Sequence, residues 1–136
     1  VHLKSGRDSV VTRQHEAKQL ADWYKSFKGE DQDVIILGDF NTYDHHPVDN
    51  PNSRTVRNLE STGLVLVSKT HEEVTNVAKT PRFYDGALVS PSLIHGEFVP
   101  RSWDVQDIPE DKLEDFKKYI SDHRPCFLRL SNSDQD

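Results

Sequence analysis

The spacing of hydrophobic and polar positions predicts a long amphipathic helix near the start of the chain. Within residues 9–27 the apolar side chains recur at helical spacing, at Ala17, Leu20, Ala21, Tyr24 and Phe27. Either Ser9 or Thr12 is a suitable capping residue for its first turn, and Gly29 is a natural stop after its last. This periodicity favours a helix that packs one face against a core.

Apolar runs of strand length alternate with this helix. Val34–Leu37 contains four consecutive branched apolar residues, which is typical of a strand buried on both faces. The other expected strands are Val1–Leu3, Leu64–Val67, Phe83–Val89, Glu97–Val99 and Phe127–Leu130. Two more helices are expected, from Ser53 to Thr62 and from Pro109 to Ile120. This order of strands and helices predicts an α/β (α+β) domain over residues 1–130, with a mixed, largely antiparallel sheet and helices on one face of it. A polar tail is expected at residues 131–136.

Composition excludes some classes of function. A chain of 136 residues is long enough for one domain, and no apolar run is long enough to span a bilayer. The single Cys126 excludes an internal disulfide framework and a cysteine-based zinc site. The net charge of -6 argues mildly against a general polyanion-binding surface, although a local basic rim or a bound cation can offset it. Because the chain starts inside an expected strand and contains no methionine, we interpret it as an excised or processed segment.

Candidate chemistry begins directly after Val34–Leu37. Asp39 and Asn41 are two residues apart at the exit of an expected strand, so both can project to the same side. Asp39 could accept a proton from water or help hold a cation, and Asn41 could donate a hydrogen bond to a phosphoryl oxygen. The same residue types favour turns, so the tetrapeptide alone leaves both interpretations open.

A second polar pair, Asp122 and His123, follows the last predicted helix. A carboxylate suits a hard cation such as Mg²⁺, and an imidazole can serve as general base or phosphate ligand at neutral pH. The ordinary alternative is a histidine at a helix C-terminus beside a capping Asp, with Pro125 preventing the helix from continuing.

Two further polar residues lie in apolar surroundings. A lone His2 in a strand is more often structural than catalytic. Asp85 needs a partner if it is buried, because an unpaired buried carboxylate is costly. If Asp85 holds His123, it would fix the tautomer of the ring and stabilise the protonated form. The alternative is a half-exposed Asp85 at a bulge.

Taken together, these segments resemble the endonuclease/exonuclease/phosphatase superfamily of deoxyribonuclease-I-like enzymes. The matching segments, in the order of the family, are His2-Leu3, Gly38-Asp39-Phe40-Asn41, Tyr84-Asp85 and Ser121-Asp122-His123-Arg124-Pro125. The helix residues Arg13, Glu16, Ala17 and Leu20 also look like the family helix that precedes Gly-Asp-Phe-Asn. The resemblance covers Val1 to about Leu130.

The resemblance implies a role for each candidate. His2 would contact the scissile phosphate, Asp39 would orient or deprotonate the attacking water, and Asn41 would position that water and the phosphate. Asp85 would orient His123, which would act as general base or as a phosphate-stabilising imidazolium. The implied cofactor is Mg²⁺ or Mn²⁺, held by Asp122, with Asp39 and Asn41 as further ligands.

The family fold is a four-layer α/β sandwich, and the resemblance matches only its C-terminal half. The first half supplies an Asn and a metal-binding Glu, and no segment before His2 corresponds to them. We therefore expect this half to pair with an N-terminal half or with a second copy of the chain, and we expect the isolated chain to be inactive.

The expected function is metal-dependent hydrolysis of a phosphoester, most simply by a nuclease-type phosphodiesterase acting on nucleic acid. The alternatives are a lipid or small-molecule phosphoesterase of sphingomyelinase or inositol-phosphatase type, and a non-catalytic fragment that serves as an interaction unit. His45 and His46 suggest a metal loop only weakly, and Trp103 is expected to pack rather than to stack on a ligand.

Overall fold

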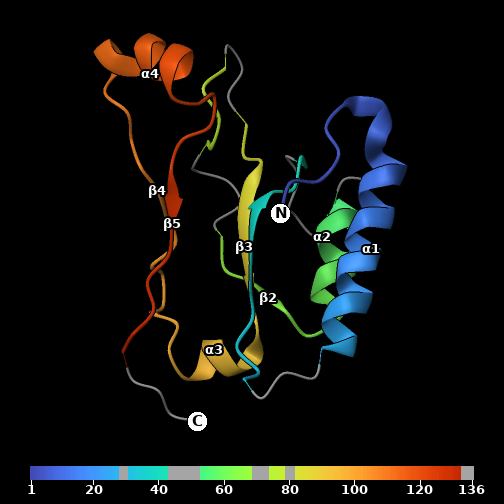
Figure 1. Ribbon diagram of the computed structural model, residues 1–136. Coiled ribbons are helices and arrows are strands. Elements are labelled where there is room, and N and C mark those ends of the chain that lie inside the picture. The colour runs from blue at the N-terminus through green and yellow to red at the C-terminus, as the bar shows by residue number, and fades with distance from the viewer. Residues whose placement is uncertain (28–30, 43–52, 69–73, 79–81, 133–136) are drawn as a thin grey trace.

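The computed structural model describes residues 1–27, 31–42, 53–68, 74–78 and 82–132, and these form a mixed α+β fold, as predicted (Figure 1). The helices are α1 (Val10–Ser26), α2 (Ser53–Glu60), α3 (Pro91–His95) and α4 (Leu113–Tyr119), with 3-10 turns at Arg7–Ser9 and Glu110–Lys112. The strands are β1 (Ile35–Asp39), β2 (Val65–Leu66), β3 (Asp85–Val89), β4 (Asp104–Val105) and β5 (Cys126–Phe127). No helix in these ranges is both long and apolar enough to cross a membrane.

The central sheet has the strand order β1-β3-β2, and both pairings are antiparallel. The start of the chain adds a parallel contact to the outer edge of β1. There, the amide of Leu3 donates to the carbonyl of Asp39 at 2.9 Å, and the amide of Asp39 donates to the carbonyl of Val1 at 3.1 Å. A separate antiparallel pair joins β4 to β5. The prediction of a mixed, largely antiparallel sheet is therefore confirmed.

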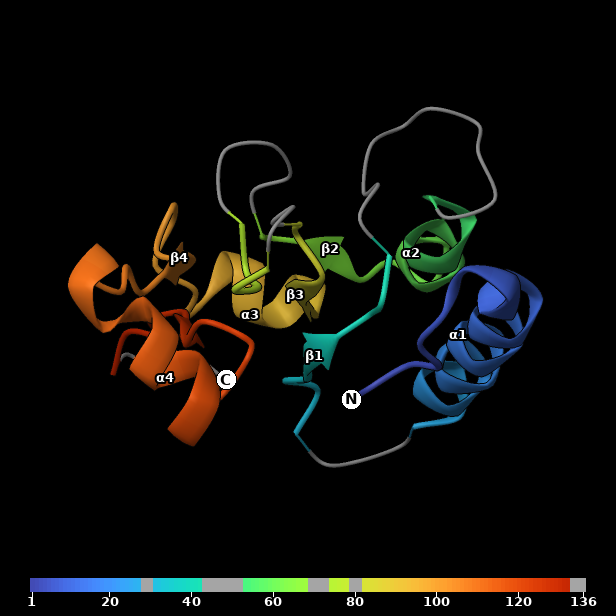
Figure 2. The ribbon, with the colours of Figure 1, turned by 90° about the horizontal axis from the view of Figure 1, so that it is seen from above.

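The core lies between this sheet and two helices. Helices α1 and α2 lie side by side over one face, as the view from above shows (Figure 2). Ala17 and Ala21 of α1 are buried in one cluster with Ile36 of β1 and Leu88 of β3. Phe40, directly after β1, is fully buried in the same cluster. The helical spacing of the apolar residues thus predicted the face of α1 that packs.

The prediction that the helices lie on one face of the sheet is wrong for half of them. Helix α3 lies at the end of β3, and α4 lies beyond β4 and β5, on the side of the sheet away from α1 (Figures 1 and 2). Pro91 opens α3, because proline lacks the N–H that a first helical residue leaves unbonded. Helix periodicity carries no signal for a helix this short.

Several smaller predictions have mixed outcomes. The expected strand Glu97–Val99 is reduced to a bridge between Phe98 and Leu130, and β4 falls in a segment that is not among the expected strands. Trp103 is 3% exposed, so its packing role is confirmed. His45, His46 and the end of the polar tail, residues 133–136, lie outside the described residues.

Candidate active site

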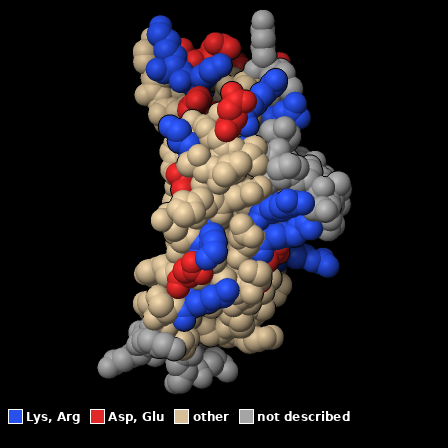
Figure 3. All heavy atoms as spheres, turned by 90° about the vertical axis from the view of Figure 1, so that its right-hand side faces the viewer, with Lys and Arg blue, Asp and Glu red and all other residues tan. Residues whose placement is uncertain are grey.

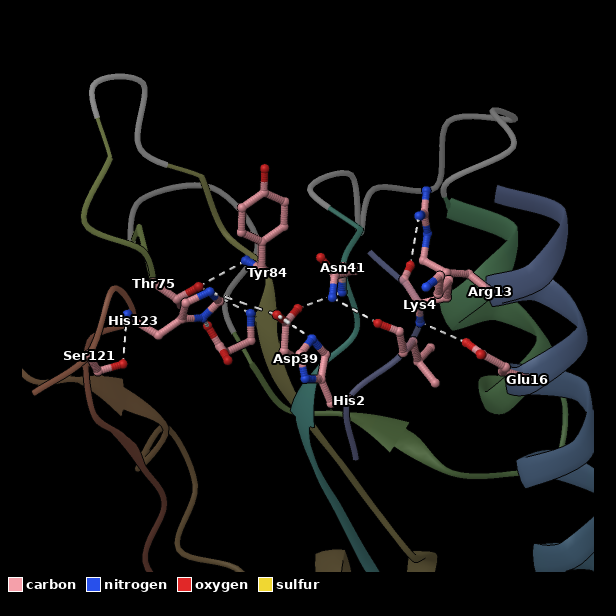
Figure 4. Close-up of polar contacts among 12 residues, drawn as sticks. His2, Lys4, Arg13, Glu16, Asp39, Asn41, Thr75, Tyr84, Ser121 and His123 are labelled. Atoms are coloured by element: carbon pink, nitrogen blue, oxygen red, sulfur yellow. Dashed lines mark hydrogen bonds and ion pairs between the residues drawn. The ribbon is translucent and has the colours of Figure 1, made fainter. Parts of the chain in front are cut away.

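Four segments that are distant in sequence meet at one edge of the sheet. In the antiparallel register of β1 and β3, Asp39 pairs directly with Asp85. The parallel bridge to Asp39 brings His2 to the same edge, and a bridge between Asn76 and His123 brings the C-terminal segment (Figure 4). An open cavity of about 530 Å³ lies there, and it is lined by Val1, His2, Ser5, Asp39, Asn41, Asp85, Asp122 and His123. All six residues that the sequence proposed therefore line one cavity.

A short polar contact in this cavity joins His123 to Asp85. The His123 Nδ1 lies 2.7 Å from Asp85 Oδ2, and both side chains are mostly buried. The ring of Tyr84 stacks on the imidazole, with 6.2 Å between ring centroids. This arrangement leaves Nε2 of His123 facing the cavity, 3.8 Å from Asp39 Oδ2. The predicted contact between Asp85 and His123 is thus present, and it favours the tautomer with the proton on Nδ1.

Thr75 supports this pair and was missed by the sequence reasoning. Its hydroxyl oxygen accepts hydrogen bonds from the amides of Tyr84 and Asp85 at 2.8 and 3.1 Å, and the residue is fully buried. Its carbonyl accepts a hydrogen bond from the amide of Arg124 at 2.7 Å. One threonine therefore ties the start of β3 to the segment that holds His123. A single threonine in a polar stretch carries no sequence signal for such a role.

Asp39 lies at the centre of the cavity. Its Oδ1 accepts the amide of Asn41 at 2.7 Å, while its Oδ2 is 3.6 Å from Nε2 of His2. Burial, together with the nearby Asp85 carboxylate, raises the pKa of Asp39, and the Asn41 amide and the two imidazoles offset part of that shift. A carboxylate with a raised pKa holds a proton more readily than an ordinary aspartate does. Asp39 is therefore suited to accept a proton from a bound group.

Asn41 has a positive φ of 50°, a conformation that asparagine tolerates better than most residues. Its Nδ2 donates to the carbonyl of Leu3 at 2.8 Å, so the side chain points towards the first residues of the chain (Figure 4). An amide nitrogen carries two N–H donors, and this bond uses one of them. Asn41 thus secures the segment that carries His2 and also borders the cavity.

The donor set fits a divalent cation only in part. The described residues contain no group of three His, Cys, Asp or Glu side chains that could hold a metal ion. Asp39, Asn41 and Asp122, whose side chains carry oxygen atoms, nevertheless line one cavity. Mg²⁺ is often bound by one or two carboxylates together with water and substrate phosphate, and it does not need a complete protein cage. The residues present fit that kind of open site.

Gly38 allows the first strand segment to pass close beside β1. Its φ is 145°, and a Cβ atom at this position would overlap the carbonyl group of Val1. We expect Gly38→Ala to destabilise the fold by about 1–3 kcal/mol and to displace His2 from the cavity. Thermal unfolding measures the loss of stability. Phosphodiester hydrolysis by an active form of the protein measures the effect of displacing His2.

Gly63→Ala is the matched control for this prediction. Gly63 also has a positive φ, of 98°, but a Cβ atom there would meet nothing within 4 Å. Its substitution adds backbone strain without a clash. If Gly38→Ala were no more destabilising than Gly63→Ala, close approach of the first segment would not be the reason for a glycine at position 38.

A scan of the chain against protein-family models found no match, and a search among curated proteins found none either.

Proposed function

We propose that this chain carries part of a phosphoester-hydrolysing site, at the edge of β1 and β3. The observation that supports the proposal best is the convergence of His2, Asp39, Asn41, Asp85 and His123 from distant segments on one cavity. Polar groups that are withdrawn from water are costly unless they are paired, and this group includes two imidazoles and a partly desolvated carboxylate. Such clusters are typical of sites that move protons and stabilise charge.

The geometry supports a role for each side chain. The Nε2 atoms of His2 and His123 both approach Asp39 Oδ2, at 3.6 and 3.8 Å, so a phosphate in the cavity would lie within reach of both rings. Protonated imidazoles there would stabilise negative charge that develops on phosphoryl oxygens. Asp39 would orient or deprotonate the attacking water. Asp85 would hold the His123 ring and stabilise its charged form.

Mg²⁺ or Mn²⁺ is part of the proposal. Asp122, Asp39 and Asn41 would hold the ion together with water and substrate, and the ion would supply further charge stabilisation at the phosphoryl group.

We favour a phosphodiesterase of nuclease type. The first test is hydrolysis of bis-p-nitrophenyl phosphate with and without Mg²⁺, run on the 136-residue chain and on any longer natural form that contains it. We expect metal-dependent turnover by the longer form and little or none by this chain. Turnover of sphingomyelin or of inositol phosphates in preference to DNA and RNA would favour the lipid or small-molecule alternative. An absence of phosphoester hydrolysis from both forms would overturn the proposal.

A further inference from the structure

A second cavity adjoins the candidate active site. It has a volume of about 360 Å³ and is lined by Gly6, Arg7, Val10, Arg13, Asn41, Arg82 and Tyr84. Asn41 borders both cavities, so the two are neighbours. We propose that this second cavity, the arginine pocket, binds another phosphate group of the same substrate, next to the one that is hydrolysed. The inference rests on the proposed function and extends it to a class of substrate.

The charge of the pocket is the first argument. Three arginines line it, and its described lining contains no carboxylate. The whole chain has a net charge of -6, and on the face that α1 presents, basic and acidic side chains are interspersed (Figure 3). Among the residues that the structure describes, the charged side chains that line this cavity are therefore all basic. The planar guanidinium group keeps its charge at all ordinary pH values and matches the geometry of phosphate oxygens.

The second argument is that the pocket wall is built by the fold. Arg13 is 2% exposed, and its Nη1 donates to the carbonyl oxygens of Lys4 and Gly6 at 3.0 and 2.7 Å (Figure 4). The amide of Lys4 also donates to Oε2 of Glu16 on α1, at 2.8 Å. These bonds hold the turn that leads into Arg7 against α1. Arg13 thus has a structural part in the pocket, while Arg7 lies at its exposed side.

The opposite wall is fixed as well. The amide of Arg82 donates to Oδ1 of Asn76 at 2.6 Å, and its carbonyl accepts the amide of Thr75 at 2.9 Å. The backbone of Arg82 is therefore tied to the segment that also supports Asp85 and His123. A ligand held by Arg82 would keep a defined position relative to the site of hydrolysis.

Tyr84 lines the arginine pocket next to His123 of the first cavity, and it indicates the kind of substrate. Its ring lines the arginine pocket and also stacks on the imidazole of His123. An aromatic ring beside a phosphate-binding pocket is suited to stack on a nucleotide base, as in proteins that bind single strands. A phosphodiester strand places phosphates on both sides of each nucleotide. We therefore assign the arginine pocket to the neighbouring phosphate of a nucleic-acid strand.

The test compares the binding of thymidine 3′,5′-bisphosphate and thymidine 5′-monophosphate to this chain by calorimetry, in EDTA so that neither is hydrolysed. We expect the bisphosphate to bind at least about tenfold more tightly, because a charge-assisted hydrogen bond to phosphate is stronger than a neutral one. Arg7→Ala and Arg82→Ala should each reduce this preference substantially. Lys18→Ala, on the exposed side of α1 and paired with Asp22, is the matched control and should leave it unchanged.

Other results of this binding experiment would contradict separate parts of the inference. Equal affinity for the two nucleotides, or a preference that survives both arginine substitutions, would overturn the phosphate pocket. A myo-inositol bisphosphate that binds as tightly as the nucleotide, through the same arginines, would overturn the assignment to a strand. If the arginine-dependent preference is present but no form of the protein hydrolyses a phosphodiester, the pocket stands and the proposed function fails.

Discussion

Substitution of His123 by alanine is expected to lower kcat for phosphodiester hydrolysis by about two or more orders of magnitude in the form of the protein that is active. The ring lies in the cavity with its Nδ1 held by Asp85 at 2.7 Å and its Nε2 directed at Asp39. Removing it takes away a group that stabilises charge or moves a proton, and it also leaves the partly buried carboxylate of Asp85 without its partner. Steady-state kinetics with bis-p-nitrophenyl phosphate give the measurement.

Two further variants separate chemistry from folding. His95→Ala removes an exposed histidine at the end of α3, far from the cavity, and should keep full activity. Asp85→Asn keeps the size of the partner but removes its charge, so we expect a loss of activity, measured as a lower kcat for bis-p-nitrophenyl phosphate. A His123→Ala enzyme within a few-fold of the wild type would refute the role assigned to His123.

Asp39→Asn is expected to lower kcat by about 10²- to 10⁴-fold, the usual contribution of a positioned proton acceptor. The amide keeps an oxygen that can accept the Asn41 N–H, so the turn after β1 should persist. The loss would then report on the missing carboxylate and not on a disrupted fold. Activity close to that of the wild type would exclude Asp39 as the group that activates water.

The same substitution should stabilise the fold at neutral pH. Burial raises the pKa of Asp39, so the folded protein holds this proton up to a higher pH than the unfolded chain does. The contribution of Asp39 to stability therefore falls as the pH rises from the ordinary carboxyl pKa through the raised value, and it stays unfavourable at neutral pH. Asparagine carries no charge, so its burial at this position does not have the desolvation cost of an ionised carboxylate.

Thermal unfolding at two pH values checks the sign of this effect. At pH 7 we expect a higher Tm for Asp39→Asn than for the wild type. The difference should shrink in acid, where the carboxyl group is protonated in both the folded and the unfolded states. A variant that is less stable than the wild type at pH 7 would show that contacts of the charged form, with His2 and His123, outweigh the cost of burial.

The sequence by itself determined the local elements and the identity of the candidate groups. The apolar positions from Ala17 to Phe27 predicted α1 and its buried face, and the four apolar residues before Gly38 predicted β1. The proposed site residues were visible because each is a polar residue in or next to a predicted strand or helix. These inferences succeeded because helix and strand periodicity are set by neighbours within a few residues.

Only the tertiary structure decided which of these groups meet. The register of β1 against β3 sets Asp39 opposite Asp85, and the bridge from Asn76 brings His123 to Asp85. The pocket of Arg7, Arg13 and Arg82 likewise joins positions up to 75 residues apart and leaves no pattern in the sequence. Strand register and the desolvation of Asp39 depend on contacts between distant segments, which no local pattern of residues encodes.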